Sequence, residues 1–333
     1  TPSCQFEFVG VWHGDATRAT LVGASGEDPG PSDGLAVNLY GSVFLPTLPI
    51  VGTVQNTLTG LAQLAWIFVL AQIVFPAVRR RPKFMSYEMT LDLIYVLQTQ
   101  LLYLTAAGAA VGISTGWLQA HTPVLFPGLK HWPIWSQVLL ALWVYDFVVY
   151  WRHRLEHQLS FLWPIHAVHH TTTKVDVFTT TRLHPLELMA GGILNMWVTA
   201  RFGIGQEAAS IGFMLYLNYN YYVHTNVKIV YPGFLKYLFV SPFMHRWHHA
   251  NEAQACNKNF GVIFAWNDWL FGTAIHPKRE PLSYGIDYEA GEVARDSYLA
   301  HLVYPFQVLG VRLFRRASAL VKRRPSALNE EAA

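Results

Sequence analysis

Eight of the fifteen histidines in this chain fall in three short clusters. The clusters are His153-Arg-Leu-Glu-His157, His166-Ala-Val-His169-His170 and His245-Arg-Trp-His248-His249. Histidine is the commonest metal ligand among side chains, and in a helix this spacing places the rings of one cluster on one face. The clusters therefore predict a nitrogen-rich site that holds more than one metal ion.

The number of histidines sets the expected number of ions. Zinc takes four ligands and octahedral metals take six, so eight imidazoles exceed the capacity of one ion. His224 follows an apolar segment and is a ninth candidate ligand, with Asn220 one helical turn earlier as a weak oxygen ligand. Imidazole suits zinc, copper, iron and nickel alike, so the residue types leave the metal open. A redox-active pair would reduce O2, whereas a zinc pair would only activate water.

Asp146 is a candidate for supporting one of these ligands. It lies seven residues before His153, on the same face of the helix expected there. A carboxylate in that place could accept the second ring N–H of a ligating histidine and so fix its tautomer. The alternative interpretation is a polar helix residue with a local partner.

The composition indicates a membrane protein. Hydrophobic residues make up 52% of the 333 residues and charged residues only 14%, against about 25% charged in soluble domains. The 12 tryptophans and 16 tyrosines are typical of membrane interfaces. A net charge of +3, with no basic block interleaved with aromatics, argues against nucleic-acid binding. Cys4 and Cys256 form no CxxC motif, which argues against a cysteine-ligated zinc or iron–sulfur site.

Apolar runs predict the elements that position the histidines. The expected membrane spans are residues 58–78, 91–114 and 134–151, followed by a hairpin of 186–200 and 207–223. Residues 37–51 are too short for a span, and 115–133 are expected to form a loop. Arg79, Arg80 and Arg81 follow the first span and mark its cytoplasmic end. Alternation of the spans then places every histidine cluster on the cytoplasmic side.

The chain divides into three expected parts. Residues 1–36 lack the basic and apolar regions of a signal peptide, and we expect a poorly ordered tail. Residues 37–290 form the membrane domain with the metal site. Residues 291–333 contain an amphipathic helix, bent at Pro305, that lies on the membrane surface, with a solvated basic tail as the alternative. The predicted fold is all-α, an integral membrane bundle of about four transmembrane helices or hairpins with a cytosolic helical cap around a dimetal site.

The order of these motifs resembles the fatty acid hydroxylase/sterol desaturase superfamily of integral-membrane di-iron oxygenases. The likeness covers about residues 55–275. Beside the three clusters it includes Arg182-Leu-His184-Pro185-Leu-Glu187, His224-Thr-Asn226, Asn259-Phe260-Gly261 and Trp266-Asn-Asp268. Three histidine boxes in this order are highly specific, whereas a single box would be weak.

The resemblance implies two iron ions that activate O2 and oxidise an unactivated C–H bond of a lipid, which could be a fatty acyl chain, sphingoid base, ether lipid or sterol. It implies a separate electron donor, a ferredoxin or a cytochrome b5-like protein. His184 and Glu187 would lie beside the metal or the substrate channel, and Asn220 stands where some relatives carry a tenth histidine. The implied iron ligands are His153, His157, His166, His169, His170, His224, His245, His248 and His249.

Three alternatives stay open. The same site could desaturate a lipid, although no motif indicates the second oriented hydrogen abstraction that an alkene requires. His153-Arg-Leu-Glu156-His157 also matches the HxxEH motif of a zinc hydrolase with Glu156 as base, which leaves both HxxHH boxes unexplained. A metal transporter would place its site near the bilayer midplane, whereas no clustered histidine falls inside an apolar span. The prediction is therefore a multi-pass di-iron monooxygenase of the bacterial inner membrane or endoplasmic reticulum, with a cytoplasmic active site.

Overall fold

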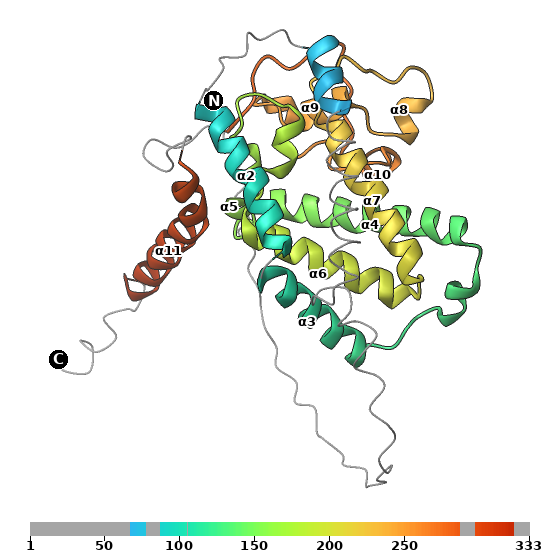
Figure 1. Ribbon diagram of the computed structural model, residues 1–333. Helices are drawn as coiled ribbons and strands as arrows, with labels where there is room; N and C mark the ends of the chain where they lie inside the picture. The colour runs from blue at the N-terminus through green and yellow to red at the C-terminus, as the bar shows by residue number, and fades with distance from the viewer. Residues whose placement is uncertain (1–66, 78–86, 105, 287–296, 323–333) are drawn as a thin grey trace, which may run out of the picture.

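The computed structural model describes residues 67–77, 87–104, 106–286 and 297–322 (Figure 1). Within these ranges the regular structure is helical, and three isolated β-bridges occur without any strand. The all-α prediction is therefore confirmed for the described residues. A helix covers residues 67–74, and the other α-helices are α2 (Tyr87–Leu104), α3 (Ala106–His121), α4 (Ile134–Gln158), α5 (Trp163–His166), α6 (Pro185–Phe202), α7 (Gln206–Val223), α8 (Leu235–Leu238), α9 (Pro242–His248), α10 (Trp266–Leu270) and α11 (Tyr298–Lys322). The short 3-10 helices are Pro127–His131, His169–Thr171, Val177–Thr181 and Ala253–Ala255.

Helix α4 is the central element of the fold. It packs against α6 and α7, and it is the one described helix that is long and apolar enough to cross a membrane. Its buried residues Ala141, Val144 and Val149 form a core with residues of α7. Gly212 of α7 allows this contact, because a Cβ there would lie 2.8 Å from the Cβ of Ala141. Since α4 carries His153 and His157 near its carboxyl end, this packing fixes the first histidine cluster.

The predicted hairpin is present as α6 and α7. The turn between them begins at Gly203, whose φ of +87° lies in the left-handed region that favours glycine. The segment before α4 packs into this turn, since Leu125 N–H donates to the carbonyl of Arg201 at 2.8 Å. The hairpin is thereby tied to the loop that leads into α4.

Gly203→Ala should destabilise the protein by about 1–3 kcal/mol, the typical cost of a strained backbone position. An alanine Cβ would lie 2.5 Å from the carbonyl oxygen of Phe126 and 2.9 Å from Cγ1 of Val124. Thermal unfolding in detergent measures the effect. Gly116→Ala is the control, because its Cβ meets nothing within 4 Å in α3. Equal midpoints for the two variants would contradict this description of the turn.

The spans agree with the sequence only in part. Residues 1–36 and 37–51 lie outside the described residues, and of 58–78 only 67–77 are described, with helix at 67–74. The expected span 91–114 corresponds to two helices, α2 and α3. The expected loop 115–133 was wrong at its start, because α3 continues to His121. Residues 115–121 contain no proline, and Pro123 is the first residue that stops a helix.

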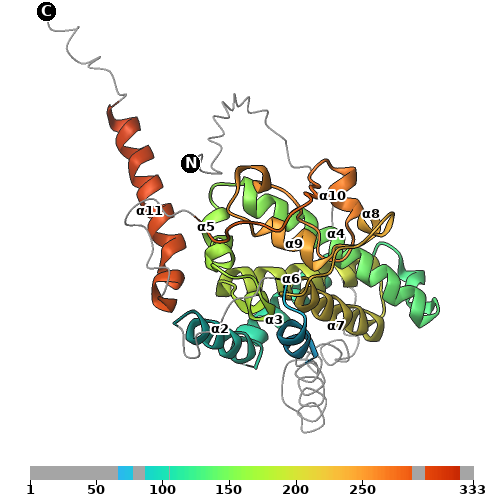
Figure 2. The same ribbon diagram turned by 90° about the horizontal axis from the view of Figure 1, so that it is seen from above.

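The segment after α7 forms a cap of short elements. Helices α8, α9 and α10 gather at one end of the bundle, above α4 and α7 in Figure 1. Helix α11 lies at the edge of the molecule beside α2 and α5 (Figure 2). It is held to α2 by Tyr298, which donates to Gln98 Oε1 at 2.7 Å, and by a contact of 2.8 Å between the Tyr95 hydroxyl and His301 Nδ1. The cap and α4 thus bring the histidine clusters to one end of the bundle.

Candidate metal centre

The structure brings the nine candidate histidines together in two groups. Within each group one ring nitrogen per residue lies within 4.8 Å of all the others. The groups adjoin, because the rings of His170 and His249 are 4.6 Å apart between centroids. The five-histidine group is His153, His157, His166, His170 and His248, and the four-histidine group is His169, His224, His245 and His249.

Each HxxHH box divides its rings between the two groups, which the sequence did not predict. In the second box the outer pair joins the five-histidine group and His169 joins the other. In the third box His245 and His249 belong to the four-histidine group, and His248 belongs to the five-histidine group. The prediction that each cluster lies on one face of a helix was wrong for the second box, since α5 ends at His166 and a separate 3-10 turn carries His169 and His170.

Backbone carbonyls and one carboxylate set the orientation of five rings. Each accepts a hydrogen bond from Nδ1, which leaves Nε2 as the free nitrogen of a neutral ring. The acceptors are Phe260 O for His153 (2.9 Å), Glu187 Oε1 for His166 (3.0 Å), Arg182 O for His169 (3.3 Å), Asn220 O for His224 (2.7 Å) and Lys258 O for His248 (2.8 Å). Backbone acceptors have no residue signature, so sequence reasoning missed four of these five partners.

The facing nitrogens fit a bound cation. Nε2 of His169 and Nε2 of His224 lie 3.2 Å apart, and both rings carry their proton on Nδ1. Two lone pairs at that distance repel each other unless a cation lies between them. Two imidazoles on one ion at about 2.1 Å, with angles of 90–110°, would have their nitrogens about 3.0–3.4 Å apart. The Nε2 separations in the four-histidine group, 2.9–3.3 Å, agree with this spacing.

Burial keeps these rings neutral and therefore able to bind metal. Desolvation lowers the pKa of His248 to about 3 and that of His224 to about 4. Nε2 of His153 is buried and has no partner among the described residues, so it too is free to bind a cation. His166 differs, because the charge and the hydrogen bond of Glu187 outweigh burial and raise the pKa of its ring.

Glu187 belongs to a carboxylate cluster beside the five-histidine group. Glu156, His166 and Glu187 come together there, and Arg152 pairs with both acids, at 2.8 Å from Glu156 and 3.6 Å from Glu187. Glu187 was a candidate from its motif, whereas Arg152 was missed. The guanidinium offsets one of the two negative charges of the buried carboxylates, and Glu187 fixes the tautomer of His166.

Glu187→Ala should weaken metal binding by the five-histidine group about 10–100-fold, the usual effect of removing a partner that orients a ligand. His166 would lose the acceptor of its Nδ1–H, and Arg152 would lose one of its two carboxylates. Competition with a chelator of known affinity measures the change. Glu187→Gln keeps an acceptor oxygen and should lose less. Unchanged affinity in the alanine variant would refute this role of Glu187.

Asp146 corrects one expectation. Its buried carboxylate accepts from no histidine and binds the loop after Phe260 instead. The donors are the backbone N–H groups of Val262 (3.2 Å), Ile263 (2.6 Å) and Phe264 (3.1 Å) and the amide of Asn267 (3.1 Å). Asp268 holds the same loop through the N–H groups of Phe260 and Gly261, both at 2.8 Å. Since the Phe260 carbonyl orients His153, Asp146 supports the ligand through this loop.

Asn220 and His184 both take part in hydrogen bonds that position helices or rings. Asn220 contributes its backbone carbonyl to Nδ1 of His224, and a weak oxygen ligand from its side chain stays a prediction. His184 caps α6, accepting from Leu186 N–H at 3.2 Å, and its Nε2 lies 3.2 Å from the carbonyl of Leu302 in α11. It is therefore a link between α6 and α11 rather than a member of the metal centre.

The sequence profile of the fatty acid hydroxylase family matches residues 138–273, a range that contains all nine histidines. Residues 138–273 are thus similar to a fatty acid hydroxylase domain. Among curated proteins, ornithine lipid hydroxylase OlsE of Rhizobium tropici is 32% identical over 60% of this chain and 62% of its own length. Human alkylglycerol monooxygenase is 28% identical over 46% of this chain and 33% of its own length.

A further relative carries a different name. Very-long-chain aldehyde decarbonylase GL1-1 of Oryza sativa subsp. indica is 29% identical over 58% of this chain and 33% of its own length. The chain thus spans about three fifths of the length of one relative and one third of the other two. No solved structure matches it.

Proposed function

We propose that this protein is a membrane-bound, O2-dependent di-iron oxygenase that hydroxylates an unactivated C–H bond of a lipid. The observation that carries the proposal is the pair of adjoining, buried groups of five and four histidines. Two groups give one site to each of two ions, and the nine histidines are the proposed ligands. The HxxEH hydrolase gains no support, because a single zinc site built on His153 and His157 leaves the four-histidine group unexplained.

The residues of the site have three tasks in this reaction. They hold neutral rings with Nε2 unprotonated, fix those rings through the Nδ1 acceptors, and exclude water by burial. Bound iron would supply the two-electron chemistry that reduces O2 and oxidises the C–H bond. The overall balance is one lipid, one O2, two electrons and two protons giving one alcohol and one water.

The proposed substrate is a lipid that reaches the site from the bilayer. Large apolar side chains are exposed on α2, α4 and α11, for example Leu97 (61%), Leu139 (58%) and Phe314 (74%), and lipid would cover them. The relatives named for hydroxylation of ornithine lipid and for alkylglycerol monooxygenation support a lipid substrate in general. The class could be a fatty acyl chain, sphingoid base, ether lipid or sterol.

The proposed topology is multi-pass, with the active site facing the cytoplasm of a bacterial cell or the cytosolic side of the endoplasmic reticulum. The basic run Arg79, Arg80 and Arg81 supports this orientation. The proposed electron donor is a separate ferredoxin or cytochrome b5-like protein, which is what the resemblance to the superfamily implies.

Comparison of lipid extracts by mass spectrometry tests the reaction type. A host that expresses the protein should accumulate a lipid that has gained one oxygen atom, and a host that expresses His245→Ala should not. A product that has only lost two hydrogen atoms would overturn hydroxylation in favour of desaturation. Identical extracts from both hosts, under supply of a suitable electron donor, would overturn the proposed oxygenase.

A further inference from the structure

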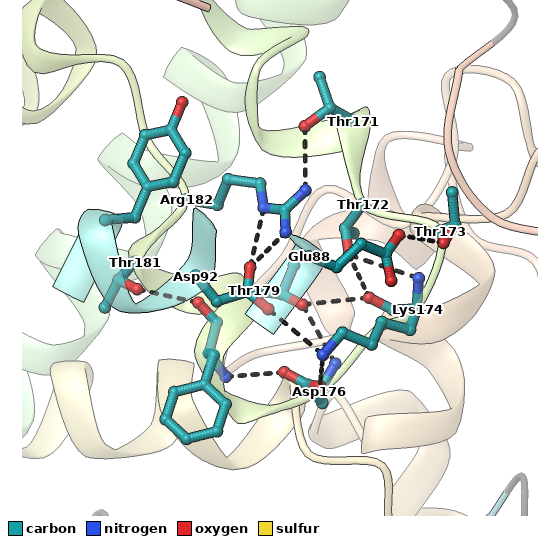
Figure 3. A network of polar contacts seen from close by, with 12 residues as sticks. Glu88, Asp92, Thr171, Thr172, Thr173, Lys174, Asp176, Thr179, Thr181 and Arg182 are labelled. Carbon is teal, nitrogen blue, oxygen red and sulfur yellow. Dashed lines mark hydrogen bonds and ion pairs between the residues drawn. The ribbon is translucent and has the colours of Figure 1, made fainter. Parts of the chain in front are cut away.

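A buried polar network connects α2 to the segment that follows the second histidine box (Figure 3). Asp92 of α2 and Arg182 are 2% and 1% exposed. Oδ1 of Asp92 accepts from Nε of Arg182 at 3.1 Å and from one of its terminal nitrogens. Lys174 pairs with the other carboxylate oxygen of Asp92 at 3.3 Å. A single acid thus binds both ends of the segment 174–182.

The backbone of Arg182 connects this network to a histidine. Its carbonyl accepts from Nδ1 of His169 at 3.3 Å, while its guanidinium donates to the hydroxyl of Thr171 at 3.3 Å. The two hydrogen bonds that Arg182 donates to Oδ1 of Asp92 therefore immobilise the residue whose carbonyl sets the orientation of the His169 ring.

The orientation of the His169 ring is important because the four-histidine group has fewer Nδ1 acceptors than the five-histidine group. Among the members of the four-histidine group only His169 and His224 have an acceptor for Nδ1, and Nδ1 of His245 and of His249 has no partner among the described residues. The five-histidine group has three acceptors of its own, on Phe260, Glu187 and Lys258. None of those three belongs to Arg182.

We propose that Asp92 is a positioning residue for the four-histidine group, acting through Arg182 on the ring of His169. The inference rests on the proposed dimetal site and extends it to α2, which lies outside the family match at residues 138–273. If the ion pair is purely structural, its loss lowers stability and affects both metal sites equally. Loss of a positioning residue lowers the metal affinity of one site and leaves that of the other unchanged.

Titration of the metal-free, full-length protein in detergent with Co2+ separates these cases. Wild type should bind two equivalents tightly. Asp92→Ala should bind one equivalent as wild type does and the other about 10–100-fold more weakly. Glu88→Ala is the matched control, since Glu88 lies one turn earlier in α2 and bonds to Thr173 in the same network without contact to a histidine acceptor. It should bind both equivalents as wild type does.

A second variant separates the metal effect from folding. Asp92→Ala leaves a lone buried guanidinium, which destabilises proteins strongly, whereas Asp92→Ala/Arg182→Met removes both charges. The double variant should recover thermal stability and keep the weakened equivalent. Full affinity for two equivalents in a stable double variant would overturn the proposal, as would equal weakening of both equivalents in Asp92→Ala. A wild type that binds fewer than two equivalents would instead count against the dimetal site itself.

Discussion

His245→Ala should empty the four-histidine group and reduce lipid oxidation by on the order of 10³-fold or more, beyond the 10–100-fold that loss of an orienting partner costs. Nε2 of His245 lies 2.9 Å from Nε2 of His224 and 3.3 Å from that of His249. Its removal leaves three imidazoles, and the reaction needs both ions. Iron analysis and product analysis on the same preparation measure both effects.

His248→Ala is the companion variant, because it removes a ring from the five-histidine group while it leaves the other group intact. Each variant should keep iron in the group that it does not touch. His131→Ala is the control for loss of any histidine, since His131 is exposed and belongs to neither group. If either variant kept its full iron content and full turnover, the substituted histidine would not be a metal ligand.

Asp146→Ala should strongly destabilise the protein. It would leave three backbone N–H groups and the Asn267 amide without their acceptor in a fully buried site. An unsatisfied buried donor costs about 1–3 kcal/mol, so a total of about 3–5 kcal/mol is expected after partial relaxation. The loop that orients His153 would loosen at the same time.

Thermal unfolding and iron content measure these two consequences of the Asp146 substitution. Asn267→Ala is the matched control, because it removes one of the four hydrogen bonds and should cost about 1 kcal/mol. If Asp146→Ala unfolded at the wild-type midpoint temperature and kept its full iron content, the loop after Phe260 would not depend on this carboxylate.

The elements that carry strong local signals could be predicted from the sequence. The long apolar run of α4 and the Gly-centred turn between α6 and α7 have a periodic or conformational signature. The nine histidines that lie together are the same nine that spacing and family resemblance selected. The spacing within each box, together with the family resemblance for His224, was therefore sufficient to predict which histidines lie together.

The arrangement within the centre could not be predicted. The division of each HxxHH box depends on where α5 ends and a 3-10 turn begins, and boundaries of short elements have weak signals. Asp146 was expected near His153 from helical spacing, but its partners lie about residues 262–267, far away in the chain. Asp92 and Arg182 are equally distant in sequence, and only the folded chain shows their contact.

The most direct test of the dimetal account is the metal content of purified protein that converts its lipid substrate. Iron and zinc are quantified per chain by mass spectrometry, and iron is assigned to the two groups through His245→Ala and His248→Ala. We expect two irons per active wild-type chain and one in each variant. One zinc and no iron per chain in an active preparation would contradict it.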